Sequence, residues 1–341
     1  MTPIDSYQDA LAKAANNGLL VESLKLDGEW HRVPLAAVKS KRKLDGAYCL
    51  SELTLKSGKV AIVGMFHNWK TGISETLTLD DRLGATAEEM AEARRKAKEA
   101  AEQSKRAKAE QHETTAKRAL TIWNKLPEQG RAPYLFGKGV RAWGLRFGKG
   151  DSVVVPAADI DGKLWTLQFI QKDGSKKFLT GGAKRGRFHL LNSPGLPDLG
   201  QANLIGIAEG YATAASIYES FNGGFPIAVA FDAGNIAAVA QAFRAKFPQT
   251  RIVIFADNDR FNTHVEAFIP QSKANNGVLY TVSQVRAVCP SVPVEVVPDD
   301  DPRLRSGEYN IGVAKAILAA AEVYGEVVIP VFSESPERLS A

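Results

Sequence analysis

The sequence predicts an α/β fold with a mostly parallel, Rossmann-like sheet in the C-terminal part of the chain. A basic β-rich segment, a long charged helix and a small β-rich N-terminal module precede it. Short continuous runs of Val and Ile alternate with helical segments after residue 203, which is typical of buried parallel strands. Before them, strand-like runs carry an excess of cations. Further upstream, residues 87–125 contain no Gly or Pro, which favours a long helix.

These changes of pattern divide the chain of 341 residues into four expected parts. They are a small β-rich module (1–85), a charged helical connector (86–128), a basic subdomain (129–200) and the α/β domain (201–341). Within the last part, residues 261–306 have the character of an insertion.

The N-terminal module is expected to contain strands over residues 47–55 and 60–66, with turns at Asp45-Gly46 and Ser57-Gly58. A basic cluster containing Lys41 and Arg42 accompanies two tryptophans, Trp30 and Trp69. Cations next to aromatic rings suit contacts to phosphates together with base stacking. The alternative is a solvated hairpin with core tryptophans.

A helix is predicted from Ala87 to about Lys125, because Thr86 and Glu89 form a capping box and strong helix formers follow. Alanine and Met90 are almost its only apolar residues before Leu120, so most of it cannot bury much surface. We expect an exposed connector. The alternative is a helix that lies along a bound nucleic acid and contacts it.

Residues 131–190 hold the excess positive charge of the chain, with twelve Lys and Arg residues against four Asp. Strand-like runs at 152–156 and 163–170 separate these charges. A sheet that presents cations can hold a polyphosphate backbone without reading its sequence. The alternative is that the cations only keep the sheet soluble. The candidate contacts to nucleic acid or nucleotide are Lys138, Arg146, Lys176, Lys177, Lys184, Arg185 and Arg187.

The α/β part is expected to contain strands at 204–208, 227–231, 251–256, 294–297 and 327–331. Helices are expected at 211–220, 236–247, 278–288 and 311–324. Ligands in such sheets lie beyond the carboxyl ends of the strands. Acidic residues follow the first, third and fourth strands, namely Glu209, Asp257 with Asp259, and Asp299 to Asp301. Converging carboxylates repel one another, so a hard divalent cation such as Mg²⁺ is the natural ligand.

Composition excludes several classes of protein. The chain is 45% hydrophobic and 24% charged, with a net charge of +5, which is ordinary for a globular protein and leans toward an anionic partner. Its apolar runs are too short for a membrane helix and its N-terminus lacks a signal peptide, so we expect a soluble, cytoplasmic protein with reduced thiols at Cys49 and Cys289. No phosphate-binding loop of a helicase motor and no nucleophile elbow occurs. We expect His189 to pack or bind phosphate rather than to catalyse.

The run from Ile205 to Tyr211, which contains Glu209, and the run from Val253 to Asp259 together resemble the TOPRIM domain of primases, topoisomerases and nucleases. Upstream, residues 134–140, 153–162 and 176–182 are similar to the subdomain that precedes TOPRIM in bacterial replicative primases and in phage and plasmid primases. Residues 28–72 resemble the N-terminal module of plasmid and phage primases that often holds a zinc ribbon. Here its cysteines are missing, so no zinc is expected.

The resemblance implies a DNA primase that joins ribonucleoside triphosphates into short primers on a single-stranded DNA template, using Mg²⁺ or Mn²⁺. A separate replicative helicase is an implied partner. Glu209 would be a metal ligand or general acid/base, and Asp257 and Asp259 metal ligands. Asp299 and Asp301 are further candidate ligands if they do not belong to the insertion. Candidate DNA contacts in the N-terminal module are Trp30, Arg32, Lys41, Arg42, Trp69 and Lys70.

Two departures from the family pattern accompany this resemblance. The glycine expected shortly after the Asp-x-Asp motif is absent, since Arg260 follows it. Relatives also carry an acidic stretch after a strand like 327–332, and this sequence ends at Ala341, so we expect a shortened chain. A metal-dependent nuclease or phosphodiesterase and a non-catalytic single-stranded DNA-binding module remain the alternatives.

Overall fold

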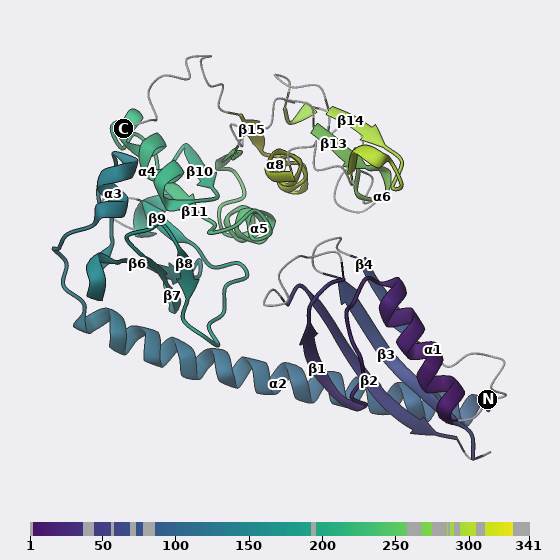
Figure 1. Ribbon diagram of the computed structural model, residues 1–341. Helices are drawn as coiled ribbons and strands as arrows, with labels where there is room; N and C mark the ends of the chain where they lie inside the picture. The colour runs from purple at the N-terminus through teal and green to yellow at the C-terminus, as the bar shows by residue number, and fades with distance from the viewer. Residues whose placement is uncertain are drawn as a thin grey trace. The chain divides into compact units, whose positions relative to one another are not determined.

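The computed structural model describes residues 3–36, 44–55, 58–68, 73–77, 86–191, 196–257, 267–274, 285, 287–289, 294–304 and 311–329. The chain divides into two compact units, residues 1–108 and 109–341, which are described separately below. Helix α2 (Ala87–Lys125) has the bounds expected from the sequence and runs through the boundary between the units (Figure 1).

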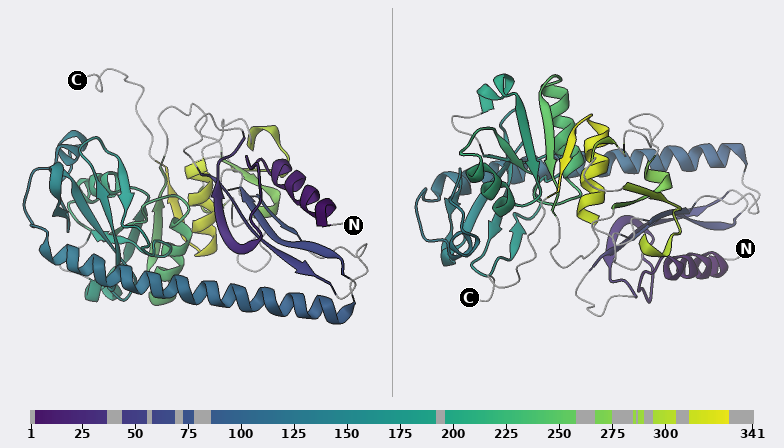
Figure 2. Two further views of the ribbon diagram at one scale, coloured as in Figure 1. Left: turned by 60° about the horizontal axis from the view of Figure 1, so that its bottom comes forward. Right: turned by 90° about the horizontal axis from the view of Figure 1, so that it is seen from above.

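The first unit is built on a four-stranded antiparallel sheet with the order β1-β2-β3-β4. Its elements are α1 (Pro3–Asn16), β1 (Asp27–Val33), β2 (Gly46–Thr54), β3 (Val60–Asn68) and β4 (Ile73–Leu77). Helix α1 lies along this sheet (Figure 2) and buries Ala10 and Ala14 against Leu50 and Phe66. The expected strands are confirmed. Helix α1 was not predicted, because small alanines form much of its buried face.

The basic segment forms a second antiparallel sheet, with the order β5-β6-β7-β8. Its strands are β5 (Arg146–Phe147), β6 (Val153–Ala158), β7 (Leu164–Ile170) and β8 (Lys176–Phe178). Val154 and Leu167 pack against Ala119 near the end of α2. Val153 and Val155, which alternate with Val154 along β6, belong to a different core cluster. The sheet is therefore buried on both faces.

The C-terminal part forms a five-stranded sheet with the order β15-β12-β10-β11-β9. Its strands are β9 (His189–Leu191), β10 (Leu204–Ala208), β11 (Ile227–Val229), β12 (Arg251–Phe255) and β15 (Glu326–Val328). Strand β9 runs antiparallel to β11, and the other pairings are parallel. The expectation of a mostly parallel sheet is confirmed.

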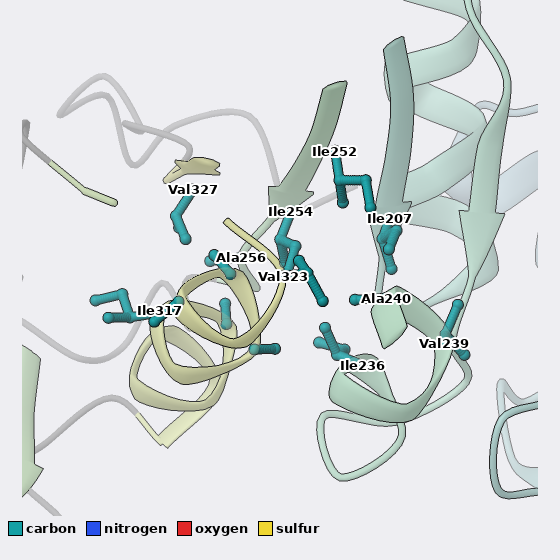
Figure 3. Close-up of a cluster of buried hydrophobic side chains, with 14 of the residues drawn as sticks. Ile207, Ile236, Val239, Ala240, Ile252, Ile254, Ala256, Ile317, Val323 and Val327 are labelled. Atoms are coloured by element: carbon teal, nitrogen blue, oxygen red, sulfur yellow. The ribbon is translucent and has the colours of Figure 1, made fainter. Parts of the chain in front are cut away.

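Helices cover both faces of this sheet. On one face, α5 (Ile236–Lys246) and α8 (Ile311–Glu322) bury Val239 and Ile317 against Ile207 and Ile254 (Figure 3). On the other, α4 (Tyr211–Ser220) shares a core cluster with Val155 of the basic segment. The basic segment and the parallel sheet therefore share one hydrophobic core.

One strand lies elsewhere than the sequence suggests. Residues 294–297 do form a strand, β14 (Val294–Val297), but it pairs with β13 (Ala267–Pro270) in a separate two-stranded parallel sheet beside α6 (Gln271–Ala274). Strand β14 therefore does not extend the main sheet, in which β15 is the neighbour of β12. Both segments are rich in Val, so local sequence cannot distinguish them. Most of the helix expected at 278–288 lies outside the described residues.

Candidate active site

The carboxyl ends of three neighbouring strands meet at one edge of the five-stranded sheet. Ala208, the last residue of β10, is in register with Val229 of β11 and with Phe255 of β12. Residues that follow these strands therefore emerge at the same level. Glu209 follows β10 directly, and Asp257 lies two residues beyond β12. The structure thus brings together two of the predicted site residues, whereas Asp259 lies outside the described residues.

The environment of Glu209 favours its protonated form. Burial raises the pKa of this half-buried carboxyl, and the nearby charges of Asp257 and Asp232 raise it further. A hydrogen bond from the backbone of Ala233 and the charge of Lys176 act in the opposite direction. Glu209 is therefore a carboxyl held among other carboxylates, with one cation close by. Such perturbed groups are typical of functional sites.

Asp232 is a member of this edge that the sequence analysis missed. It lies three residues beyond β11, the strand between β9 and β10 in the sheet. The signal that places Glu209 and Asp257, an acidic residue after a buried strand, also applies to Asp232.

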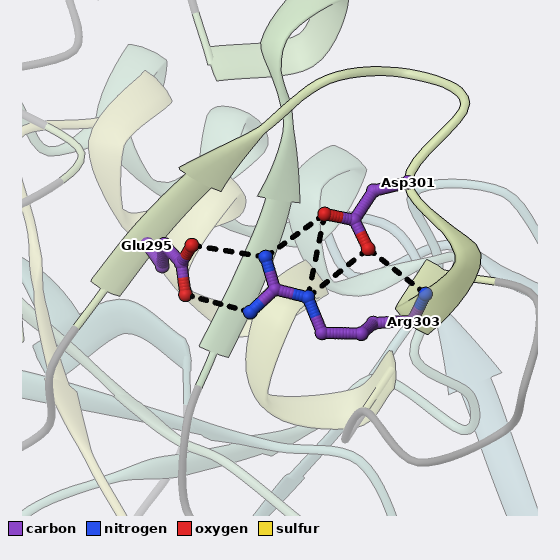
Figure 4. A network of polar contacts seen from close by, with 3 residues as sticks. All are labelled: Glu295, Asp301 and Arg303. Atoms are coloured by element: carbon purple, nitrogen blue, oxygen red, sulfur yellow. Dashed lines mark hydrogen bonds and ion pairs between the residues drawn. The ribbon is translucent and has the colours of Figure 1, made fainter.

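Asp299 and Asp301 have partners in the segment that contains β13 and β14. Asp299 accepts hydrogen bonds from the backbone and the hydroxyl of Ser272, at 3.1 and 2.7 Å. Asp301 is paired with Arg303, whose guanidinium also binds Glu295 (Figure 4). These contacts hold the pKa of both aspartates below its ordinary value. Neither residue is among the groups that shift the pKa of Glu209, so their role as metal ligands stays a prediction.

Lys176 of β8 brings a cation to the acidic edge. A Cβ atom added to Gly210 would lie 3.8 Å from Lys176 Nζ, which places the ammonium group beside the start of α4. The neighbouring Lys177 is also exposed, but successive residues of a strand point to opposite faces. Phe178, on the same face as Lys176, packs edge-on against Phe231 next to Asp232. Lys176 therefore points toward the acidic edge and Lys177 away from it.

Residues 184–187, here called the basic turn, bring further cations. Lys184 Nζ lies 2.5 Å from the carboxylate of Asp232. Arg187 lies with its guanidinium 4.5 Å from the ring centre of Trp165. Arg185 is exposed. Burial raises the pKa of Glu322 on α8, and the charge of Arg185 partly opposes that rise. Of these three predicted contacts, the structure brings Lys184 to the acidic edge.

Arg146 has a structural environment. Its guanidinium donates hydrogen bonds to the backbone oxygen of Trp123 and to Glu128, and lies 4.7 Å from the ring centre of Trp123. Arg146 therefore joins β5 to the end of α2. Lys138, in contrast, is exposed in the last turn of α3 (Pro133–Lys138).

The N-terminal candidates are only partly described. Trp30 is 49% exposed on β1, and Arg32 donates a hydrogen bond from Nε to the backbone oxygen of Leu44 at 3.0 Å. The remaining four candidates, Lys41, Arg42, Trp69 and Lys70, lie outside the described residues. Their contact to DNA stays a prediction.

His189 packs inside the second unit, as expected. It is buried, and Nε2 donates a hydrogen bond to the backbone oxygen of Trp143 at 2.8 Å. Burial lowers the pKa of the imidazole to about 4. The ring is therefore neutral at physiological pH and holds the segment before β5 in place.

The family model described as Toprim domain matches residues 204–288, a range that contains β10, β11 and β12 and the three carboxylates of the acidic edge. The chain is related to two DNA primases TraC from Escherichia coli. It is 35% identical to one over 271 residues and 36% identical to the other over 272 residues. Each match covers 76% of this chain, but only 18% and 24% of the relatives. The chain therefore spans about a quarter or less of the length of these primases.

Among solved structures, the chain is similar to the DnaG primase catalytic domain bound to single-stranded DNA. The match covers 60% of this chain and 66% of that chain, with 15% identity and a TM-score of 0.26. Within the described residues, no helix is long and apolar enough to cross a membrane.

Toprim domains typically bind a divalent metal ion. The described carboxylates fit such an ion, since Glu209 is repelled by Asp257 and Asp232, and a divalent cation would relieve that repulsion. In the described ranges, no group of three or more His, Cys, Asp or Glu side chains is gathered closely enough to hold the ion by itself. Asp259, the third predicted ligand, falls outside those ranges.

Proposed function

We propose that this chain is the catalytic part of a DNA primase of the plasmid and phage type, which synthesises short oligoribonucleotides on single-stranded DNA. The observation that carries the proposal is the acidic edge formed by Glu209, Asp257 and Asp232 beside Lys176. The relationship to the TraC primases supports the same activity.

The site residues divide the work between carboxylates and cations. Glu209, Asp257 and Asp259 would hold Mg²⁺ or Mn²⁺. When bound, the ion would neutralise negative charge on the phosphoryl oxygens during nucleotidyl transfer. Lys176 and Lys184 lie beside the carboxylates and would bind the triphosphate of the incoming ribonucleotide. A site with both groups can hold a triphosphate that carries its own metal ion.

The template would be single-stranded DNA held by the exposed cations of the basic segment. Lys138, Lys177 and Arg185 are exposed and available for phosphate contacts. Such contacts need no base-specific readout, because the template sequence is read by base pairing with the incoming ribonucleotide. A separate helicase would supply the single strand.

The function is tested by incubating the protein with single-stranded DNA, labelled ribonucleotides and Mg²⁺ or Mn²⁺, followed by a denaturing gel. We expect short labelled oligonucleotides from the wild type and none from Asp257→Asn or Glu209→Gln. Asp173→Asn is the matched control, because this exposed aspartate only caps a turn through Ser175. Asp299→Asn tests the remaining metal prediction, and full activity would remove Asp299 from the site.

Two outcomes would contradict the proposal. Shortening of the template, lost in Asp257→Asn, would identify a metal-dependent nuclease instead. DNA binding without any new oligonucleotide, under conditions in which a TraC primase is active, would favour a binding module.

A further inference from the structure

The loop between β11 and α5 has an unusual backbone. Phe231 has a φ of +73°, in the left-handed region that residues other than glycine rarely adopt. Its ring is nevertheless buried, 5.2 Å from the ring centre of Phe178 and nearly perpendicular to it. Strained backbone of this kind persists only where surrounding contacts impose it, and it is frequent at functional sites.

Asn235, at the end of this loop, is a buried polar side chain whose amide accepts one hydrogen bond and donates two. It is 2% exposed. Its Oδ1 accepts a hydrogen bond from the backbone of Gly186 at 2.7 Å, and its Nδ2 donates to the oxygens of Arg187 and Ala230, each at 2.9 Å. Asn235 therefore joins the basic turn to the end of β11, the strand that leads to Asp232.

The basic turn has a shape that suits this attachment. Gly186 has a φ of +69°, and the backbone N–H of Arg187 donates to the oxygen of Lys184 at 3.0 Å. Lys184 then reaches Asp232 at 2.5 Å. Asp232 is close enough to Glu209 to raise its pKa. The contacts thus form a continuous path from Asn235, through the basic turn, to the acidic edge.

We propose that Asn235 is a positioning residue that holds the basic turn against the acidic edge, so that Lys184 binds the phosphates of an incoming ribonucleoside triphosphate. The inference rests on the proposed function, because it assigns a triphosphate to the same site. A lysine on an exposed turn would otherwise lose conformational freedom when it binds. Attachment of the turn before binding reduces this entropic cost.

The test measures the dissociation constant of ATP in Mg²⁺ by equilibrium titration, for the wild type, Asn235→Ala, Asn235→Asp and Lys184→Ala. We expect each single variant to raise the dissociation constant by about tenfold, the effect of one charge-assisted contact. Asn235→Asp keeps the side-chain volume and the acceptor for Gly186 but loses both donated bonds. Asn68→Ala is the matched control: Asn68 is also a buried amide, in the first unit, and should leave ATP binding unchanged.

The double variant Asn235→Ala with Lys184→Ala separates positioning from general destabilisation. If Asn235 acts through Lys184, the second substitution changes the dissociation constant less than twofold beyond the first. Fully additive effects would overturn the inference, as would unchanged ATP binding in a folded Asn235→Ala protein. Should both Asn235 variants fail to fold, unchanged binding in Lys184→Ala, whose side chain is 44% exposed, would still overturn it.

The two proposals fail in different ways. ATP binding that depends on Asn235, without primer synthesis, would contradict only the proposed function. Primer synthesis with ATP binding insensitive to Asn235 and Lys184 would contradict only the inference. A wild type that makes primers without measurable ATP binding in the titration would also overturn the inference.

Discussion

Replacing Arg146 by Met should destabilise the second unit without weakening DNA binding. The methionine keeps an apolar stem but removes the guanidinium that joins β5 to the end of α2. The sequence suggested a phosphate contact at this position, whereas the structure shows that Trp123 and Glu128 already engage the guanidinium. The substitution therefore distinguishes a structural cation from a DNA-binding one.

The expected loss can be estimated from the contacts. The hydrogen bond to the Trp123 backbone is charge-assisted and contributes about 2 kcal/mol. The cation–π contact with the Trp123 ring contributes about 0.5–1 kcal/mol. The ion pair with Glu128 contributes little, because that carboxylate is 78% exposed. The total is about 3 kcal/mol, which lowers the melting temperature of a unit of this size by about 6–12 °C.

Calorimetry of the full chain and a titration of single-stranded DNA at several salt concentrations would measure both effects. Arg141→Met is the matched control, because its guanidinium also lies near a tryptophan ring, at 4.9 Å from Trp143, but is 74% exposed. It should cost less than about 1 kcal/mol. An unchanged melting temperature in Arg146→Met, with a smaller salt dependence of DNA binding, would refute the structural role.

Three further predictions concern charge. Lys176→Ala should weaken ATP binding in a titration more than Lys177→Ala does, because only Lys176 points toward the acidic edge; equal losses would contradict this orientation. The raised pKa of Glu209 means that its ionised form destabilises the fold as pH rises through that pKa, so with a chelator present Glu209→Gln should raise the urea midpoint at pH 7 and have little effect at pH 4. An equal rise in the urea midpoint at both pH values would argue against a raised pKa of Glu209. Burial lowers the pKa of His189 from 6.5 to about 4, so the fold should lose about 3 kcal/mol of stability as pH falls through that window. Urea unfolding at pH 7 and at pH 4 should show a smaller loss of stability for His189→Gln than for the wild type. An equal loss would assign the acid sensitivity to other groups.

Local sequence predicted the elements of the second unit better than their pairing. Residues 294–297 and 326–328 are both short Val-rich strands, and either could have completed the parallel sheet. The choice depends on packing between residues far apart in the chain, such as Val327 against Ile254, which periodicity does not encode.

For the candidate site, the rule that ligands lie beyond the carboxyl ends of strands placed Glu209 and Asp257 together. The same rule could have found Asp232. It could not have separated the roles of the cations, because Arg146 and Lys176 carry the same charge in the same basic segment. Only the fold shows that one joins two elements and the other lies beside the acidic edge.

The shared core between the basic segment and the parallel sheet determines how the protein can be dissected. Tyr211 and Ala215 of α4 lie in the same cluster as Val155 and Ile170 of the antiparallel sheet. A fragment limited to residues 201–341 would leave that face of α4 uncovered and would also lack β9, exposing the edge of β11. Residues 109–200 are therefore as much a part of the folding unit as the strands of the parallel sheet. Such a fragment would also lack Lys176 and Lys184, the two cations that lie beside the acidic edge.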